Sequence, residues 1–377
     1  MKILFITNIP VPYRVDFFNT LGKFVDLTVI FEAKLVRGIS FDWKNEDDLN
    51  FKPIFLSNSF IEEKKVDWKI LKHIKKNEYD MVVATNYSYY TETVAILKLI
   101  FSKIPFVFEI DGGIIRNENK IQYNTKRFLL SKPILYFSPS KSSDECLIHY
   151  GADKEKIVRY PFTSVLKNDI SDNIVTNEEK AQLRAELGIK EKNIVLYIGQ
   201  YIYRKGLDVL LNATPYINDK SSTAIILVGG NATKEYEDII NKNKFENIYF
   251  VPFQNKDNLS KYLRCADLFV LPTREDVWGL VINEAMAYGL PIITTDKCVS
   301  GIELIENEEN GYIVQSENSE LLGEKINLIL DNKNLRDSMA SNNLKKISSY
   351  TIEEMVKRHI EVFEKIVSEM KNKGDRK

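Results

Sequence analysis

The sequence has few cysteines, almost no net charge and no long apolar run, and each of these features excludes a class of protein. The three cysteines lie far apart and form no CxxC pair, which argues against a disulfide framework and a thiolate metal site. The 52 basic residues nearly balance the 53 acidic ones, so no overall field attracts nucleic acid. No apolar run reaches the roughly 18 residues that span a bilayer. We therefore predict a cytoplasmic protein that has no membrane span and binds no nucleic acid.

A glycine-rich dinucleotide loop is missing after the first strand-like run. Asn8, two prolines and Tyr13 stand where G-x-G-x-x-G would let a pyrophosphate approach the backbone. Because proline removes amide donors and stiffens a loop, this segment argues against an NAD or FAD site. The loop still lies at the ligand-facing carboxyl end of its strand, so Pro12 and Arg14 are candidates for ligand contact. The alternative is a rigid turn with a surface arginine.

Apolar, β-branched runs alternate with longer stretches of helical period throughout the chain. This alternation predicts βαβ units, and near-continuous apolarity predicts strands that are covered on both faces. A chain of 377 residues exceeds the roughly 250 to 300 that one core accommodates. We therefore predict an α/β protein with two Rossmann-like, doubly wound parallel-sheet domains. The predicted strands are KILFIT, LTVIFE, MVVAT, PFVFEI and LYFSPS, then NIVLYIG, AIILVGG, IYFVPF, LFVLPT, PIITTD and GYIVQ.

A polar stretch between the two sets of strands predicts the domain boundary. Residues 167–192 are rich in Asn, Asp, Glu and Lys, so we assign residues 1–165 to the first domain and 166–349 to the second. After Tyr350 the apolar residues recur at helical spacing, with Thr351 as N-cap and Glu354 three residues later. We predict a long closing helix over 350–377, which returns to the first domain.

The segment VLYIGQYIYRKGLDVLLNA predicts an anion site. A strand ends at Gly199, Arg204 and Lys205 follow in a loop, and Gly206 opens the next helix. Two cations beside free helix amides bind anions, and they stabilise the negative charge that develops on a leaving diphosphate. The alternative is a solvated Arg-Lys pair.

The segment LPTREDVWGLVINEAMAYGLPIITT carries the most specific pattern. A strand is followed by the acidic pair Glu275 and Asp276, and Gly279 then opens a helix. Glu284 lies in that helix among apolar residues, where a carboxylate needs a hydrogen-bonding partner. Vicinal ribose hydroxyls are suitable partners, while the first helix amides suit a phosphate. The alternative for Glu284 is an ion pair inside the domain.

These segments resemble the acidic-x7-Glu signature of retaining nucleotide-sugar glycosyltransferases of family four. Asp276 and Glu284 stand in the two acidic positions, and the resemblance covers nearly all of residues 193–315, including LVGG and VPFQNKDNLSKYLRCADLFVLPT. It implies the GT-B fold, in which two Rossmann-like domains face each other across a cleft, and a nucleotide-sugar donor bound by the second domain. The implied donor-binding residues are Gly199, Arg204, Lys205, Phe253, Glu275, Asp276, Val277, Trp278, Gly279, Leu280, Val281 and Glu284.

Two positions depart from the family pattern. Gly199 is followed by Gln200 instead of the usual arginine, so Arg204 is the candidate for the second phosphate-binding cation. The first acidic position is Asp276 instead of glutamate, with Glu275 adjacent, so either carboxylate can face the donor sugar.

FVFEIDGGI places Glu109 and Asp111 on one face of a strand end, because side chains alternate along a strand. Such a pair can hold magnesium. Lys205 and Arg204 already neutralise a diphosphate, however, so we expect no metal and no cofactor. We favour Asp111, beside Gly112 and Gly113, as an acceptor-side residue that positions the acceptor or takes its proton. A purely structural turn is the alternative.

Three other features have both a functional and a structural interpretation. His73, His149 and His359 share no ligand spacing, which predicts surface or packing roles instead of a zinc site. The aromatic residues of NYSYYTET can stack acceptor sugars or pack on their own helix. The basic amphipathic segment NKIQYNTKRFLLSKPILYF can lie on an anionic membrane at the inner face of the cell or pack as an ordinary helix.

Together with the resemblance, these observations predict a metal-independent glycosyltransferase of the hexosyltransferase type, and the resemblance implies that transfer retains the anomeric configuration. It would move a sugar from a nucleoside-diphosphate sugar to a glycan or lipid-linked acceptor, and the resemblance suggests bacterial surface polysaccharide synthesis, such as lipopolysaccharide or capsule. One alternative is a nucleotide-sugar isomerase or epimerase of the same fold. Another is a non-catalytic subunit that binds nucleotide sugars.

Overall fold

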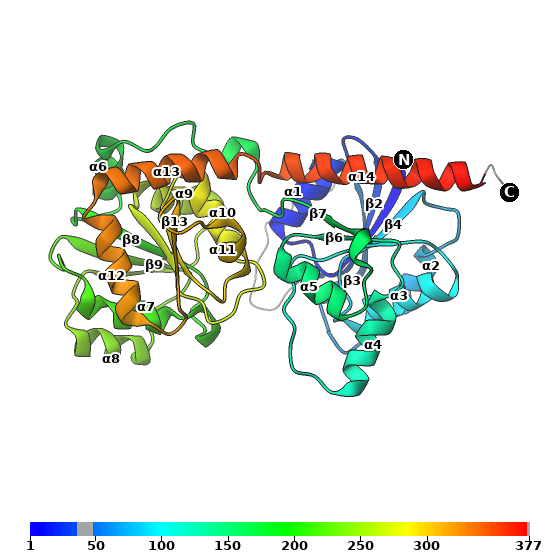
Figure 1. The fold of residues 1–377 in the computed structure, drawn as a ribbon, viewed down its shortest axis with the longest axis horizontal. Coiled ribbons are helices and arrows are strands. Elements are labelled where there is room, and N and C mark those ends of the chain that lie inside the picture. Colours follow the sequence, from blue (N-terminus) through cyan, green and yellow to red (C-terminus); the bar gives the residue numbers. More distant parts are fainter. Residues whose placement is uncertain (36–47, 375–377) are drawn as a thin grey trace. The chain divides into compact units, whose positions relative to one another are not determined.

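The computed structural model describes residues 1–35 and 48–374. The chain divides into two compact units (Figure 1). Unit 1 comprises Met1–Ser164 and Thr351–Lys377, and unit 2 comprises Val165–Tyr350.

Unit 1 is built on a seven-stranded sheet with the order β3-β2-β1-β4-β5-β6-β7, in which neighbouring strands are parallel. The order reverses between β1 and β4, and open α/β sheets bind ligands at the carboxyl ends of the strands that flank such a reversal. The elements are β1 Lys2–Thr7, α1 Pro12–Leu21, β2 Asp26–Leu35, β3 Lys52–Phe60, α2 Ile70–His73, β4 Met81–Ala84, α3 Tyr90–Phe101, β5 Val107–Glu109, α4 Lys120–Leu130, β6 Leu135–Ser138, α5 Lys141–His149, β7 Ile157–Arg159 and α14 Ile352–Gly374.

Unit 2 is built on a six-stranded parallel sheet with the order β10-β9-β8-β11-β12-β13. This is the Rossmann order, and its reversal lies between β8 and β11. The elements are α6 Asn177–Glu186, β8 Asn193–Ile198, α7 Leu207–Ala213, β9 Thr223–Val228, α8 Lys234–Asn243, β10 Ile248–Val251, α9 Lys256–Cys265, β11 Leu268–Leu271, α10 Leu280–Ala287, β12 Ile292–Thr295, α11 Val299–Leu304, β13 Gly311–Val314, α12 Ser319–Leu330 and α13 Lys333–Ile347.

The predicted fold class is confirmed: every apolar run assigned to a strand contains one. Residues of the central strands β1, β8, β9 and β11 are almost all fully buried, because helices cover both faces of each sheet. Two strands, β3 and β7, were not predicted. Both are edge strands with partly exposed side chains, and β3 carries Pro53 as edge strands tolerate.

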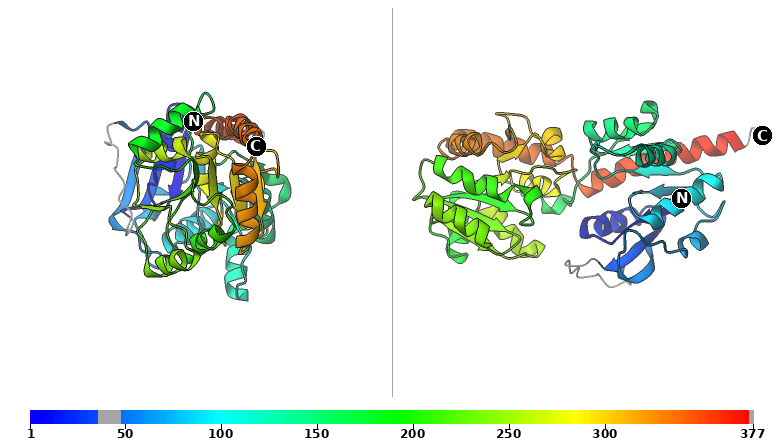
Figure 2. Two further views of the ribbon diagram at one scale, coloured as in Figure 1. Left: turned by 90° about the vertical axis from the view of Figure 1, so that its left-hand side faces the viewer. Right: turned by 90° about the horizontal axis from the view of Figure 1, so that it is seen from below.

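The closing helix α14 belongs to unit 1 (Figure 2). Thr351 caps it by accepting a hydrogen bond from the amide of Glu354 at 3.3 Å. The helix packs against α1, and buried Phe363 contacts the rings of Phe5 and Phe137. Unit 1 is therefore completed by the end of the chain.

Candidate functional site

The loop after β8 brings two cations to the carboxyl end of β11. A short 3-10 helix, Tyr203–Lys205, is followed by Gly206 as N-cap of α7 with φ of 68°. A Cβ on Gly206 would lie only 2.0 Å from the carbonyl oxygen of Pro272, just beyond β11. Both the backbone conformation and this close approach require glycine. The sequence RKG thereby positions its Arg and Lys at the sheet reversal of unit 2.

Both cations contact the acidic pair that follows β11. The Nζ of Lys205 lies 2.5 Å from Oδ2 of Asp276, while Nη1 of Arg204 donates to the carbonyl of Glu275 at 2.7 Å and lies 3.6 Å from Oδ1 of Asp276. The Lys205 side chain is 15% exposed and that of Arg204 is 42% exposed. A negatively charged ligand can reach both.

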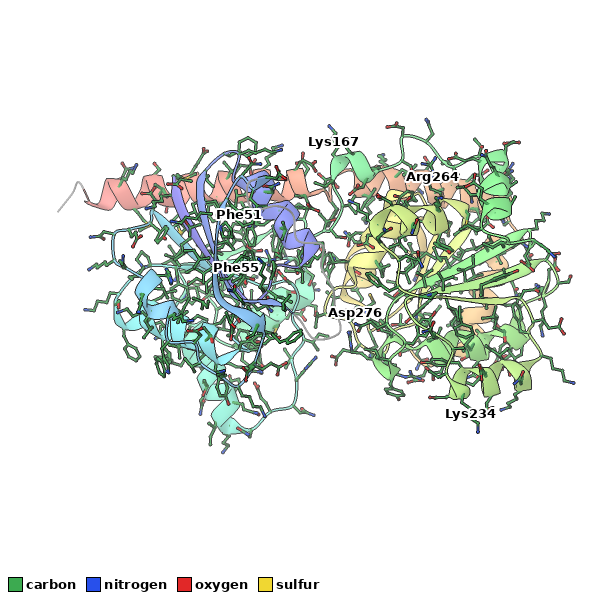
Figure 3. The ribbon with its side chains drawn as sticks, turned by 180° about the vertical axis from the view of Figure 1, so that it is seen from behind. Phe51, Phe55, Lys167, Lys234, Arg264 and Asp276 are labelled. Atoms are coloured by element: carbon green, nitrogen blue, oxygen red, sulfur yellow. The ribbon has the colours of Figure 1, made fainter. Side chains whose placement is uncertain are left out.

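Asp276, labelled in Figure 3, is the carboxylate that faces Lys205. Its amide donates to the carbonyl of Lys297 and its carbonyl accepts from the amide of Val299, so the loops after β11 and β12 hold it from both sides. Asp276 is 5% exposed, whereas Glu275 is half-buried. Of the two carboxylates that the sequence proposed, Asp276 is the one that pairs with Lys205.

The helix after the acidic pair begins as expected from its glycine. Gly279 is the N-cap of α10 with φ of 93°, and Leu280 and Val281 form its first turn. The first amides of a helix have no partner within it, so this end suits a phosphate oxygen. Glu284, one turn further, is half-buried instead of enclosed among apolar side chains, which leaves part of the side chain open to a ligand.

Three other predicted donor residues differ in their surroundings. The Trp278 side chain is buried, and its Nε1 donates to Oδ1 of Asn283 at 2.9 Å, so it packs within unit 2. Val277, in contrast, is 39% exposed. Phe253 is 79% exposed and follows β10, which lies two strands, or about 10 Å, from β8 in the sheet.

β8 ends at Ile198, one residue before the predicted end at Gly199, and the amide of Gly199 donates to the carbonyl of Val228 at 2.9 Å. Gly229, after β9, has φ of 129°, and a Cβ there would lie 2.3 Å from the Gly199 carbonyl oxygen. The two strand ends therefore approach each other closely at the same edge of the sheet.

Arg274 holds this edge together, a role that sequence reasoning missed. Its guanidinium makes two hydrogen bonds to the Asp208 carboxylate, at 2.8 and 2.6 Å, contacts Glu317 and lies 3.9 Å from the centre of the Tyr203 ring. Hydrogen bonds to Asp208 and Glu317 raise the pKa of Arg274. These contacts of Arg274 hold the loop that carries Arg204 and Lys205 in place.

In unit 1, Arg14 joins the two carboxylates that the sequence suggested for magnesium. Its Nη1 lies 2.5 Å from Oε1 of Glu109, its Nη2 contacts Oδ1 of Asp111, and the Tyr13 hydroxyl donates to Oδ2 of Asp111 at 2.8 Å. Arg14 is 2% exposed instead of lying on the surface. Its guanidinium therefore orients Asp111.

His359, on α14, completes this network from the other end of the chain. Its Nε2 lies 3.1 Å from Oε2 of Glu109 and its Nδ1 lies 2.7 Å from the carbonyl of Met355, while Phe137 stacks on the ring. Burial raises the pKa of Glu109, but Arg14 and His359 more than offset this effect and lower it to about 2. The packing role predicted for this histidine is thus combined with a buried contact to the Glu109 carboxylate.

A pocket of about 270 Å³ lies at the sheet reversal of unit 1. It is bounded by residues after β1, β4 and β5, namely Asn8, Arg14, Thr85, Tyr87, Asp111 and Gly112. The stretch Asn86–Ser88 of the predicted aromatic loop forms one wall. Pro12 begins α1 and is exposed, and Gly113 packs against Cys146, so neither lines this pocket.

The described residues contain no cluster of three or more metal-ligating side chains.

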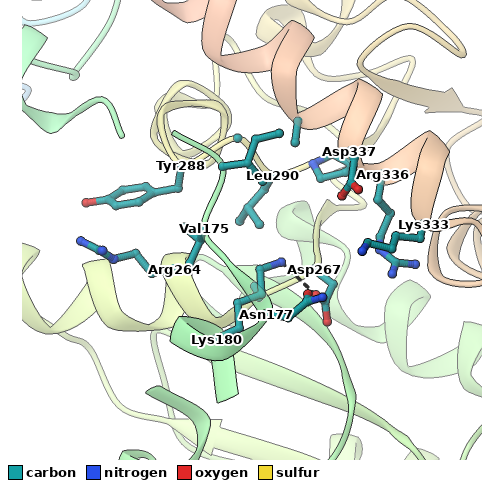
Figure 4. A pocket seen from close by; sticks show the side chains of 15 residues that line it. Val175, Asn177, Lys180, Arg264, Asp267, Tyr288, Leu290, Lys333, Arg336 and Asp337 are labelled. Carbon is teal, nitrogen blue, oxygen red and sulfur yellow. Dashed lines mark hydrogen bonds and ion pairs between the residues drawn. The ribbon is translucent and has the colours of Figure 1, made fainter. Parts of the chain in front are cut away.

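A further pocket in unit 2 lies at the amino ends of β11 and β12, opposite the Lys205 edge (Figure 4). There Asp267 binds Lys180 and Arg184 at 2.9 and 2.8 Å, so its charge is balanced within the unit. Among the described helices, none is both long and apolar enough to cross a membrane.

Comparison with known proteins places these features in a family. Residues 179–346 match the family described as "Glycosyl transferases group 1". An uncharacterized glycosyltransferase of Methanocaldococcus jannaschii is 26% identical over 267 residues, which cover 69% of this chain and 67% of that protein. The N,N'-diacetylbacillosaminyl-diphospho-undecaprenol alpha-1,3-N-acetylgalactosaminyltransferase of Campylobacter jejuni is 23% identical over 288 residues, covering 74% and 75%.

Among solved structures, Anabaena HepE in complex with UDP superposes with a TM-score of 0.78 at 18% identity, covering 97% of this chain and 100% of that one. This likeness confirms the two-domain fold. The chain has the two-domain GT-B fold, and residues 179–346 of its second unit match the group 1 glycosyl transferase domain.

Proposed function

We propose that the chain is a retaining, metal-independent hexosyltransferase that moves a sugar from a nucleoside-diphosphate sugar to a glycan or lipid-linked acceptor. The observation that carries this proposal is the convergence of Lys205 and Arg204 on Asp276 at the sheet reversal of unit 2. Cations and a carboxylate that lie together at such an edge suit a ligand that has both anionic and hydroxyl groups.

In this proposal unit 2 binds the donor. Lys205 and Arg204 hold the diphosphate, and their charge stabilises the leaving group more strongly as its negative charge develops. Glu284 accepts hydrogen bonds from the ribose hydroxyls, and Asp276 contacts the donor sugar. The UDP in the Anabaena HepE structure supports a nucleotide ligand of this class.

Unit 1 binds the acceptor in the pocket beside Asp111. The bond between C1 of the sugar and the diphosphate oxygen breaks, the acceptor oxygen bonds to C1 on the same face, and the acceptor proton passes to the departing phosphate oxygen. Asp111, which Arg14 and Tyr13 hold in place, orients the acceptor hydroxyl.

The biological setting we propose is surface polysaccharide synthesis at the cytoplasmic face of the membrane. The Campylobacter relative has a lipid-linked acceptor in its name. On α4 of this chain only Leu129 and Leu130 are buried, while Ile121 is 79% exposed beside basic residues such as Lys120 and Arg127. Cosedimentation with phosphatidylglycerol vesicles but not with phosphatidylcholine vesicles would support such a contact.

A thermal-shift screen against nucleoside-diphosphate sugars tests the proposal. A ligand at 100 times its Kd adds about 2.7 kcal/mol to the apparent stability. Transfer is then assayed with the stabilising donor. Release of nucleoside diphosphate that depends on an acceptor supports a transferase. Donor rearrangement without such release would identify an isomerase, and donor binding without turnover would identify a binding subunit.

A further inference from the structure

A buried polar network connects α14 with the pocket beside Asp111 in unit 1. Its members are, in order, His359, Glu109, Arg14 and Asp111. The first three are 0 to 2% exposed, whereas the Asp111 side chain is 37% exposed. Arg14 and Asp111 line the pocket, and His359 reaches it only through Glu109. The network therefore links a histidine that is enclosed in the core to the carboxylate that faces the pocket.

One guanidinium serves two carboxylates in this network. Nη1 of Arg14 lies 2.5 Å from Oε1 of Glu109, and Nη2 contacts Oδ1 of Asp111. An arginine frequently binds a single carboxylate through two parallel hydrogen bonds, one to each oxygen. Such a pair with Glu109 would occupy both of its oxygens and would withdraw Arg14 from Asp111. The shared arrangement therefore requires that the second oxygen of Glu109 be held by another group.

His359 holds that second oxygen. Its Nε2 lies 3.1 Å from Oε2 of Glu109, and its Nδ1 lies 2.7 Å from the carbonyl oxygen of Met355. Burial raises the pKa of Glu109, but Arg14 and His359 lower it to about 2, so the carboxylate is ionised at neutral pH. A carbonyl and an ionised carboxylate only accept hydrogen bonds, so the ring satisfies both when each nitrogen carries a hydrogen. Oε1 then remains for Nη1 of Arg14, and Nη2 remains for Asp111.

Aromatic rings restrict the movement of both nitrogen-bearing side chains. Phe137 stacks on the imidazole of His359 with 4.1 Å between the ring centres. Three rings lie 5.8 to 6.0 Å from the guanidinium of Arg14, namely those of Tyr13, Phe17 and Phe162. Because buried side chains are closely packed, neither group can turn without disturbing these contacts. The division of the guanidinium between two carboxylates is therefore built into the core of unit 1.

We propose that His359 is a positioning residue of the acceptor site. By holding Oε2 of Glu109 it keeps Arg14 shared between two carboxylates, and Arg14 in turn keeps Asp111 in the orientation that receives the acceptor hydroxyl. His359 itself is fully buried and touches no substrate. The inference rests on the proposed function, because it assigns the last helix of the chain a part in orienting the acceptor.

The NMR resonance of the Asp111 carboxyl carbon, identified by its absence in Asp111→Asn, tests the network without a ligand. His359→Phe keeps a ring against Phe137 but removes both nitrogens. The pKa of Asp111 measured in this variant should rise, because the carboxylate loses a hydrogen bond from a cation. His359→Gln, whose amide nitrogen can replace Nε2, should restore the wild-type value. Val356→Ala, a buried truncation on the same helix, should leave it unchanged.

Two results of this titration would overturn the inference. One is an unchanged pKa of Asp111 in His359→Phe. The other is an equal rise in Val356→Ala, which would show a general effect of loosening α14. Unfolding temperatures of all variants, measured alongside, show whether a change reflects a lost fold.

Transfer kinetics test the consequence for the acceptor. The donor is the one that the thermal-shift screen selects, and the acceptors are the methyl glycosides of glucose, galactose and N-acetylglucosamine. In His359→Phe, kcat/KM for the acceptor should fall roughly ten-fold or more, while the Kd for UDP should not change. In an Asp111→Asn background the same substitution should cause almost no further loss. An equal loss in both backgrounds would show that His359 does not act through Asp111.

Failure of this inference is distinguishable from failure of the proposed function. If the wild type transfers sugar and His359→Phe transfers it equally well, only the positioning role fails. If the wild type binds neither UDP nor any nucleotide sugar, the proposed function fails. The Asp111 titration still decides in that case whether His359 acts on Asp111.

Discussion

The Nζ of Lys205 lies 2.5 Å from Oδ2 of Asp276, although 71 residues separate the two in sequence. The pair joins the loop after β8 to the loop after β11, the two strands that flank the sheet reversal of unit 2. It presents a cation and a carboxylate side by side where we propose that the diphosphate and sugar of a donor bind.

Lys205→Ala should weaken UDP binding by roughly 10- to 100-fold, because a charge-assisted hydrogen bond contributes about 1.5 to 3 kcal/mol. Isothermal titration calorimetry measures the change. Lys190→Ala is the matched control, since Lys190 is exposed and precedes the amino end of β8. Similar affinities for the two variants would remove Lys205 from the diphosphate site.

Glu284→Ala should nearly abolish transfer and should remove discrimination between UDP and its 2′,3′-dideoxy analogue. The physical reason is the loss of a carboxylate that accepts hydrogen bonds from both ribose hydroxyls. The wild type should prefer UDP by roughly 10-fold or more. Glu324→Gln, on the exposed face of α12, serves as control. A variant that retains the preference would show that the ribose lies elsewhere.

EDTA should leave the transfer rate unchanged to within about two-fold, because Lys205, Arg204 and the start of α10 supply the positive charge that a metal would supply. Initial rates are compared in EDTA and in added Mg²⁺. Activation of more than ten-fold by Mg²⁺ would show that a metal takes part in donor binding.

Glu109→Gln should destabilise unit 1 by about 3 to 5 kcal/mol at neutral pH, because Arg14 would lose a buried counter-charge and Nε2 of His359 would lose its carboxylate partner. The pKa of Glu109 is lowered to about 2, so its contribution is complete above its ordinary pKa of 4.5 and is lost as the pH falls from there toward 2. Denaturant titrations at pH 7 and pH 3 measure both effects. Glu361→Gln, at an exposed ion pair on α14, should change stability little.

Glu32→Gln should flatten the pH dependence of stability between pH 4.5 and 7. Burial raises the pKa of Glu32 to about 7, so the wild-type fold loses up to roughly 3 kcal/mol as the pH rises through that range. The variant cannot ionise and should be more stable than the wild type at pH 8. Glu62→Gln changes an exposed carboxylate and should follow the wild-type curve. Superimposable stability curves for all three proteins would contradict a buried Glu32 carboxyl.

Sequence reasoning predicted the parts of the fold whose signal is local. Strands that are covered on both faces carry continuous apolar runs, so β1, β8 and β9 could be recognised directly. The edge strand β3 could not, because its partly exposed side chains interrupt the apolar pattern. The three-residue strand β7 is too short to carry a pattern at all.

The candidate donor site could also be predicted, because its signal is local in sequence. Arg204, Lys205 and Gly206 are contiguous, and Glu284 lies eight residues after Asp276. Which carboxylate faces Lys205 depended on the path of the loop after β11. The sequence analysis considered Arg14, Asp111 and His359 separately. Their association around Glu109 joins segments that are far apart in the chain, so no local sequence pattern indicates it.

The sequence by itself determined the two-sheet architecture, the closing helix and the group 1 motif, because hydrophobic period, caps and short motifs act over a few residues. Tertiary structure alone decided how charges from distant segments are paired: α1 and α14 are brought to β5, and the loop after β8 to the loop after β11. Within residues 1–35 and 48–374 it also left Oε2 of Glu32 and both carboxylate oxygens of Glu92 buried without a hydrogen bond. Such pairing depends on packing across hundreds of residues, which no local pattern records.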